Sequence, residues 1–83
     1  MTKATKTETN KGTEYTIILP DGNKATRTTK KEYTHVLLIR WADGHYSVAM
    51  WSGSMAGAQR EFRAWNGKGG YADATLTVEE LDF

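Results

Sequence analysis

The sequence predicts a small α+β domain in which two β-hairpins and a C-terminal strand form a small antiparallel sheet packed against one helix, in the order β-β-β-β-α-β. Two turn signals and one helical stripe predict it: Pro-Asp-Gly-Asn at 20–23, Asp-Gly at 43–44, and regularly spaced apolar residues from Met55 to Trp65. A chain of 83 residues is short for two cores, so we expect a single α+β domain over residues 14–83.

The first thirteen residues, MTKATKTETNKGT, are mostly Thr, Lys, Glu, Asn and Gly. This composition buries too little apolar surface to offset the entropy lost when a chain is ordered. We therefore expect a flexible polar N-terminal arm over residues 1–13. Its lysines precede no apolar run, so no signal peptide or membrane anchor is expected there.

The two hairpins differ in how well the sequence defines them. In the first, Tyr15, Ile17 and Leu19 alternate on one face before the turn, and Thr-rich residues follow it. In the second, Asp43-Gly44 predicts a two-residue type I′ loop. Pairing Ala42 with His45 closes this loop, and the register that follows puts four pairs on the core face: Trp41 with Tyr46, Ile39 with Val48, Leu37 with Met50 and His35 with Ser52.

The helix has a start signal, an apolar stripe and a stop signal. Ser54 is suited to the N-cap, and Met55, Ala58, Phe62 and Trp65 follow at helical spacing, so we expect this stripe to pack on the sheet. Asn66 or Gly67 suits the left-handed position after the helix. Alternation at 72–79 then predicts a half-buried last strand.

The reverse face of the second hairpin is the predicted binding surface. Trp51 falls there beside apolar neighbours, and it is exposed unless the first hairpin folds over it. Trp is enriched among the residues that dominate protein interfaces, which makes Trp51 the preferred anchor. The predicted partner-binding residues are Trp51, Arg40, Leu38, Val36, Lys30 and Lys31.

No catalytic, metal-binding or cofactor-binding site is predicted, and we do not expect an enzyme. The chain has no cysteine, its two histidines fall at opposite ends of one hairpin, and WSGSMAG lacks the nucleophile-elbow pattern. NGKGG follows a helix and lacks phosphate-loop spacing. A net charge of +1 indicates neither a strongly basic nor a strongly acidic protein, and the absence of cysteine fits the cytoplasm.

Residues 26–65, TRTTKKEYTHVLLIRWADGHYSVAMWSGSMAGAQREFRAW, combine a Tyr-Thr-His entry, an apolar strand, an Asp-Gly turn, a strand with Trp and Ser, and an Ala-rich helix. This arrangement resembles small uncharacterised accessory proteins of tailed bacteriophages. The resemblance implies a viral protein that binds and inhibits a host protein, such as a host defence component, in the host cytoplasm. A nucleic-acid-binding protein with a basic and aromatic sheet face is the alternative, and a phage structural component is the third interpretation.

Overall fold

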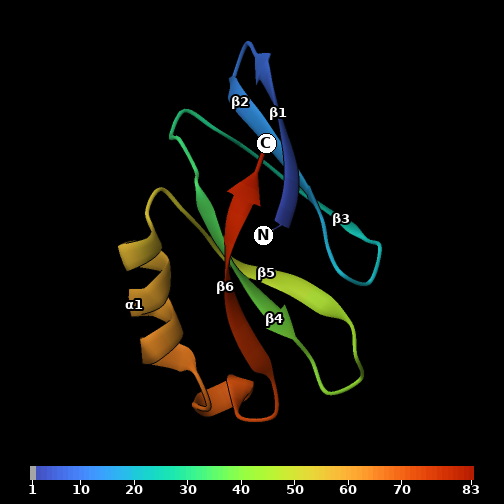
Figure 1. The fold of residues 1–83 in the computed structure, drawn as a ribbon, viewed down its shortest axis with the longest axis vertical. Coiled ribbons are helices and arrows are strands. Elements are labelled where there is room, and N and C mark those ends of the chain that lie inside the picture. The colour runs from blue at the N-terminus through green and yellow to red at the C-terminus, as the bar shows by residue number, and fades with distance from the viewer. Residues whose placement is uncertain (1) are drawn as a thin grey trace.

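The computed structural model describes residues 2–83, which form a six-stranded sheet with one α-helix (Figure 1). The α+β class is confirmed, but the sheet is larger than two hairpins and one strand. Its strand order is β3-β2-β1-β6-β4-β5. The elements along the chain are β1 (Thr2–Thr9), β2 (Gly12–Ile18), β3 (Lys24–Thr29), β4 (His35–Arg40), β5 (Tyr46–Ser52), α1 (Met55–Trp65), the 3₁₀ turn η1 (Gly69–Tyr71) and β6 (Thr75–Asp82).

The expected flexible arm is wrong for residues 2–13, while residue 1 lies outside the described residues. β1 pairs antiparallel with β2 from Ala4–Ile17 to Thr9–Gly12, and it pairs parallel with β6 at Thr2–Leu81 and Lys3–Asp82. Both Thr2 and Ala4 are buried. Threonine is β-branched and suits an exposed sheet face, so a Thr-rich polar segment can form a strand when its neighbours supply the core.

The sheet curls into a nearly closed barrel around the first of two hydrophobic clusters. Tyr15, Ile17 and Leu19 of the first hairpin are buried there, as their alternation predicts. β4 contributes Val36 and Leu38 to the same cluster. Across the opening between β3 and β5, the Tyr46 backbone N–H donates to Asp21 Oδ2 in the β2–β3 turn at 3.0 Å. One cluster therefore joins the first hairpin to the second.

The predicted register of the second hairpin is correct in one half and shifted in the other. His35–Ser52 and Leu37–Met50 pair as expected, but the register then changes, and Leu38 pairs with Val48. Ala49 is thus an extra residue in β5, which is the definition of a β-bulge. Because side chains alternate along a strand, the bulge places Val48 and Tyr46 against the first cluster instead of on the helix side.

The turn of this hairpin is also longer than predicted. Gly44 N–H donates to Trp41 O and Trp41 N–H donates to His45 O, both at 2.9 Å, so the loop has three residues. Gly44 has φ +93°, whereas no non-glycine residue among residues 2–83 has a positive φ. A type I turn followed by a glycine bulge fits these values, and type I′ does not. The bulge at Ala49 then restores the register that the longer loop displaced.

Helix α1 lies on the other side of β4–β6, over the second cluster of Leu37, Ile39 and Leu76. Ser54 is its N-cap and accepts the Gly57 N–H at 3.1 Å, and Gly67 has φ +72° after its end, as predicted. The expected burial of the whole apolar stripe is wrong, since Ala58 is the only buried helix residue. Met55, in the first turn of the helix, and Trp65, in its last turn, are both exposed.

Candidate binding groove between α1 and β6

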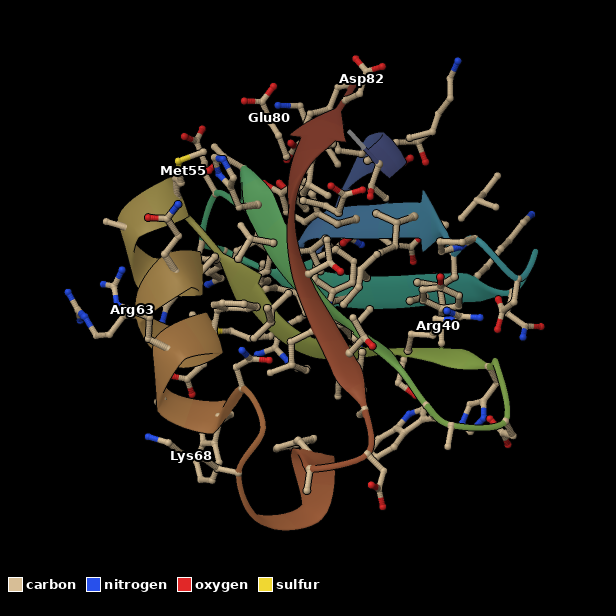
Figure 2. The ribbon with its side chains drawn as sticks, turned by 60° about the horizontal axis from the view of Figure 1, so that its bottom comes forward. Arg40, Met55, Arg63, Lys68, Glu80 and Asp82 are labelled. Atoms are coloured by element: carbon tan, nitrogen blue, oxygen red, sulfur yellow. The ribbon has the colours of Figure 1, made fainter. Side chains whose placement is uncertain are left out.

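An open groove runs between α1 and β6 on the outside of the second cluster. Its volume is about 440 Å³, and most of its lining is apolar. Phe62, Leu76 and Val78 form the floor. Figure 2 shows α1 standing beside β6, with Arg63 on the helix and Arg40 on the other side of the sheet. The lining residues are Gln59, Phe62, Arg63, Leu76, Thr77 and Val78.

The helix wall of the groove follows from the spacing of three residues. Gln59, Phe62 and Arg63 stand at i, i+3 and i+4, so they share one face of α1. The Ser54 cap fixes where the helix begins, and the small, buried Ala58 allows the backbone to approach the sheet. Phe62 is therefore only half-buried: part of its ring packs on the second cluster and the remainder faces the groove.

The strand wall of the groove is a sheet edge without a neighbour. β6 pairs with β4 from Thr75 to Glu80, but β1 reaches β6 only at Leu81 and Asp82. On the side away from β4, the stretch Thr75–Val78 thus has no strand partner within residues 2–83. Unpaired backbone N–H and C=O groups at a sheet edge are ready to bond another extended chain.

The direction of one backbone hydrogen bond of β6 shows which backbone groups of this strand face the groove. Leu81 N–H donates to Thr34 O at 2.8 Å, so Leu81 points its backbone groups toward β4. In an antiparallel ladder this direction alternates along the strand. Thr75, Thr77 and Glu79 therefore also point toward β4, whereas Leu76 and Val78 direct their N–H and C=O groups to the free side.

Arg63 is the only charged residue among the described residues that line the groove. It is exposed, and no carboxylate within the described part of the chain lies in ion-pair range of it. Trp65 Nε1 donates to Glu61 Oε1 at 3.2 Å, and neither of these residues lines the groove. The groove thus combines an apolar floor with one unpaired positive charge at its rim.

A row of aromatic rings joins the end of α1, the segment after it and the turn of the second hairpin. Trp65 contacts Tyr71 edge-on at 5.9 Å between centroids, Tyr71 contacts Trp41 at 6.0 Å, and Trp41 stacks on His45 at 6.1 Å. Trp41 Nε1 donates to Ser47 Oγ at 3.0 Å. These contacts hold the loop after α1 against the turn of the second hairpin.

Asp21 and Asp43, in the turns of two hairpins and outside the groove, have lowered pKa values. The backbone N–H groups of Asn23 and then Tyr46 lower the pKa of Asp21 below its usual 3.8 because they stabilise the carboxylate. The backbone N–H and then the ring of His45 lower the pKa of Asp43 for the same reason. Each carboxylate therefore has a local role at a hairpin end.

The predicted binding surface is corrected at its centre, because Val36 and Leu38 are buried in the first cluster and cannot contact a partner. The first hairpin folds over this face, which was one of the two possibilities for Trp51. Trp51 is half-buried, with ring centroids 6.4 Å from Tyr15 and 5.8 Å from Tyr33. The aromatic residues of β2 and of the β3–β4 loop thus occupy the place that a partner was expected to fill.

The three predicted basic residues are exposed but do not form one site. Lys30 and Lys31 follow β3, before β4 begins, whereas Arg40 is the last residue of β4. The six residues of β4 separate them by roughly 20 Å at about 3.3 Å per residue. The structure therefore divides the predicted set into a buried pair, a covered Trp and two distant patches.

The serines and histidines have structural contacts. Ser52 Oγ donates to Ser54 O at 2.7 Å and accepts the Ser54 N–H at 3.2 Å, which organises the start of α1. His35 is buried with Nδ1 2.8 Å from Thr34 Oγ1, and His45 lies in the turn against Asp43. Within residues 2–83, no three His, Cys, Asp or Glu side chains cluster as metal ligands do.

No protein-family description, curated protein or solved structure matches this chain. Among the residues that the structure describes, no helix has the length and apolar character needed to cross a membrane. The groove was not among the features predicted from the sequence. The helix spacing of Gln59, Phe62 and Arg63 was visible in the sequence, but the free edge of β6 depends on where β1 begins to pair.

Proposed function

We propose that this protein is a non-enzymatic binding protein that acts by occupying a partner protein, and that the α1–β6 groove is its contact surface. The observation that carries the proposal is an apolar groove open along one side, bordered by an unpaired strand edge. A pocket for a small molecule encloses most of its ligand. An open groove with free backbone groups instead suits a polypeptide, which supplies both apolar side chains and backbone hydrogen bonds.

The resemblance of residues 26–65 to small phage accessory proteins adds a biological setting to this proposal. In that setting the partner is a host protein, such as a defence component, that is blocked in the host cytoplasm. The nucleic-acid alternative is less well supported, because Arg40 is distant from Lys30 and Lys31 and no exposed aromatic side chain is described between these patches. Phosphate-tracking surfaces need neighbouring cations.

Site-specific photocrosslinking in a bacterial lysate tests the proposal. A benzophenone amino acid is placed at Gln59, on the groove wall, and in a matched variant at Thr28, which is exposed on β3. We expect a discrete, nuclease-resistant protein adduct from position 59 and none from position 28. Equal labelling from both positions, or no adduct at 59, would refute the groove as the contact surface, and nuclease-sensitive adducts would favour nucleic acid.

A further inference from the structure

We propose that the groove binds an extended segment of the partner, which adds to the sheet as a strand beside Leu76 and Val78 of β6. This inference rests on the proposed function and specifies its ligand: a peptide with apolar side chains at alternate positions and an acidic residue near the helix. The place for the added strand lies on the side of β6 where β1 pairs only at Leu81 and Asp82.

The free backbone groups of β6 are spaced to bind an extended segment of a partner protein. Leu76 and Val78 each present one N–H and one C=O to the free side, two residues apart. In an antiparallel pair such residues exchange two hydrogen bonds with the residue opposite, and the next bonded pair follows two residues later. An added strand could therefore form up to four backbone hydrogen bonds without any change in the register between β6 and β4.

The directions of the side chains on β6 indicate a ligand with apolar residues at alternate positions. Residues directly opposite each other in a ladder direct their side chains to the same face of the sheet. Leu76 packs in the second cluster with Phe62 and Val78 against it, so ligand residues opposite Leu76 and Val78 would face Phe62 across the groove. Ligand residues between them would point to the other side of the sheet. Apolar side chains are thus required at every second position only.

This edge lacks the features by which sheets usually prevent such pairing. Natural edge strands carry Lys, Pro or a bulge, or they are covered. β3 carries Lys24 and Arg27, and β5 contains the bulge at Ala49. The stretch Thr75–Val78 has no charged residue and no proline, and its pairing with β4 is regular. The unprotected segment is the one that borders the apolar groove.

The positive charge of Arg63 at the rim of the groove indicates that the ligand carries a negative charge there. Arg63 lines the groove and has no carboxylate partner within the described chain, so an acidic ligand side chain would pair with it. Arg60 offers a matched control: it is exposed on the same helix but does not line the groove. Charge reversal at position 63 should therefore lower the affinity for an acidic ligand, whereas charge reversal at position 60 should not.

The test begins with a display library of randomised ten-residue peptides. Peptides that bind the intact protein are selected from this library and sequenced. We expect enriched peptides to share two apolar residues separated by one position, with a nearby Asp or Glu. In NMR titrations of the ¹⁵N-labelled protein, an enriched peptide should slow amide exchange at Leu76 and Val78. N-methylation of the peptide amide that bonds β6 should weaken binding about 3- to 10-fold, which corresponds to loss of one hydrogen bond.

Charge variants complete the test. Arg63→Glu should weaken the enriched peptide about 3-fold or more at low salt, while Arg60→Glu leaves its affinity nearly unchanged. The proposal is overturned if no peptides are enriched, if the N-methylated peptide binds equally well, if the protected amides lie elsewhere, or if the free protein already dimerises through β6. If the adduct at position 59 still forms, protein binding survives and only strand addition is rejected.

Discussion

Gly12, at the start of β2, is the position where the fold most clearly requires glycine. Its φ is +131°, and a Cβ there would lie 2.5 Å from the backbone oxygen of Thr29 at the end of β3. Real Cβ atoms essentially never come this close, and the atom that would have to move belongs to the backbone. We therefore predict that Gly12→Ala strains the turn and also pushes β3 away from β2.

The size of this effect follows from two costs. A non-glycine residue in such a backbone region costs of order 1–3 kcal/mol, and overpacking adds about 1–3 kcal/mol. We expect Gly12→Ala to lower the free energy of unfolding by about 3 kcal/mol or more. At about 4–8 °C per kcal/mol for a domain of this size, Tm should fall by about 12 °C or more.

Two other glycines provide matched controls. Gly22 has φ +91° but nothing within 4 Å of the place that an added methyl group would take, so Gly22→Ala should show the conformational cost alone, about 1–2 kcal/mol. Gly70 has neither a positive φ nor a close neighbour, so Gly70→Ala should change stability by less than about 1 kcal/mol. Urea and thermal unfolding, followed by circular dichroism, measure all three. If Gly12→Ala were as stable as Gly22→Ala, the close approach of β3 to Gly12 would be refuted.

Three further predictions test other parts of the fold. Deletion of Thr2–Thr9 should abolish cooperative unfolding, because β1 joins β2 to β6; a variant with an unchanged Tm would restore the flexible-arm interpretation. Ile17→Ala should lower the free energy of unfolding by about 2–5 kcal/mol, since Ile17 is 0% exposed, whereas Trp65→Ala, at a position 46% exposed, should have a clearly smaller effect in the same urea titration. The lowered pKa of Asp21 stabilises the fold above pH 3.8, and this stabilisation is lost as pH falls through the folded pKa. Asp21→Asn should therefore reduce stability at pH 7 and flatten the acid limb of a stability–pH curve, and an unchanged curve would exclude the bridge to β5.

The elements that the sequence predicted correctly are those with local causes. Ser54 caps α1 through a hydrogen bond three residues away, and Gly67 ends the helix region with a positive φ. The alternation of Tyr15, Ile17 and Leu19 placed them in the core because a strand face is set by its own residues. Local chemistry was sufficient in each case.

The elements that the sequence missed depend on distant partners. The strand β1 has few apolar residues, and its inward Ala4 is buried because distant parts of the chain form the first cluster around it. The Asn-Lys-Gly run at 10–12, between two Thr-rich segments, was the available signal for this hairpin. The bulge at Ala49 and the free edge of β6 have no comparable local signal, so Val48 and the candidate groove could be placed only with the strand pairings known.

The parallel pairing of β1 with β6 has a consequence for how the chain reaches its folded state. Thr2 and Leu81 are neighbours in the sheet but are separated by almost the whole sequence, so their pairing requires a very large loop to close. During synthesis, the β1–β3 meander can form early, but it has no sheet to join until β6 has left the ribosome. The barrel around Tyr15 and Ile17 therefore stays open until β6 has been translated, and non-local closure of this kind slows folding and lengthens the time in which chaperones can bind.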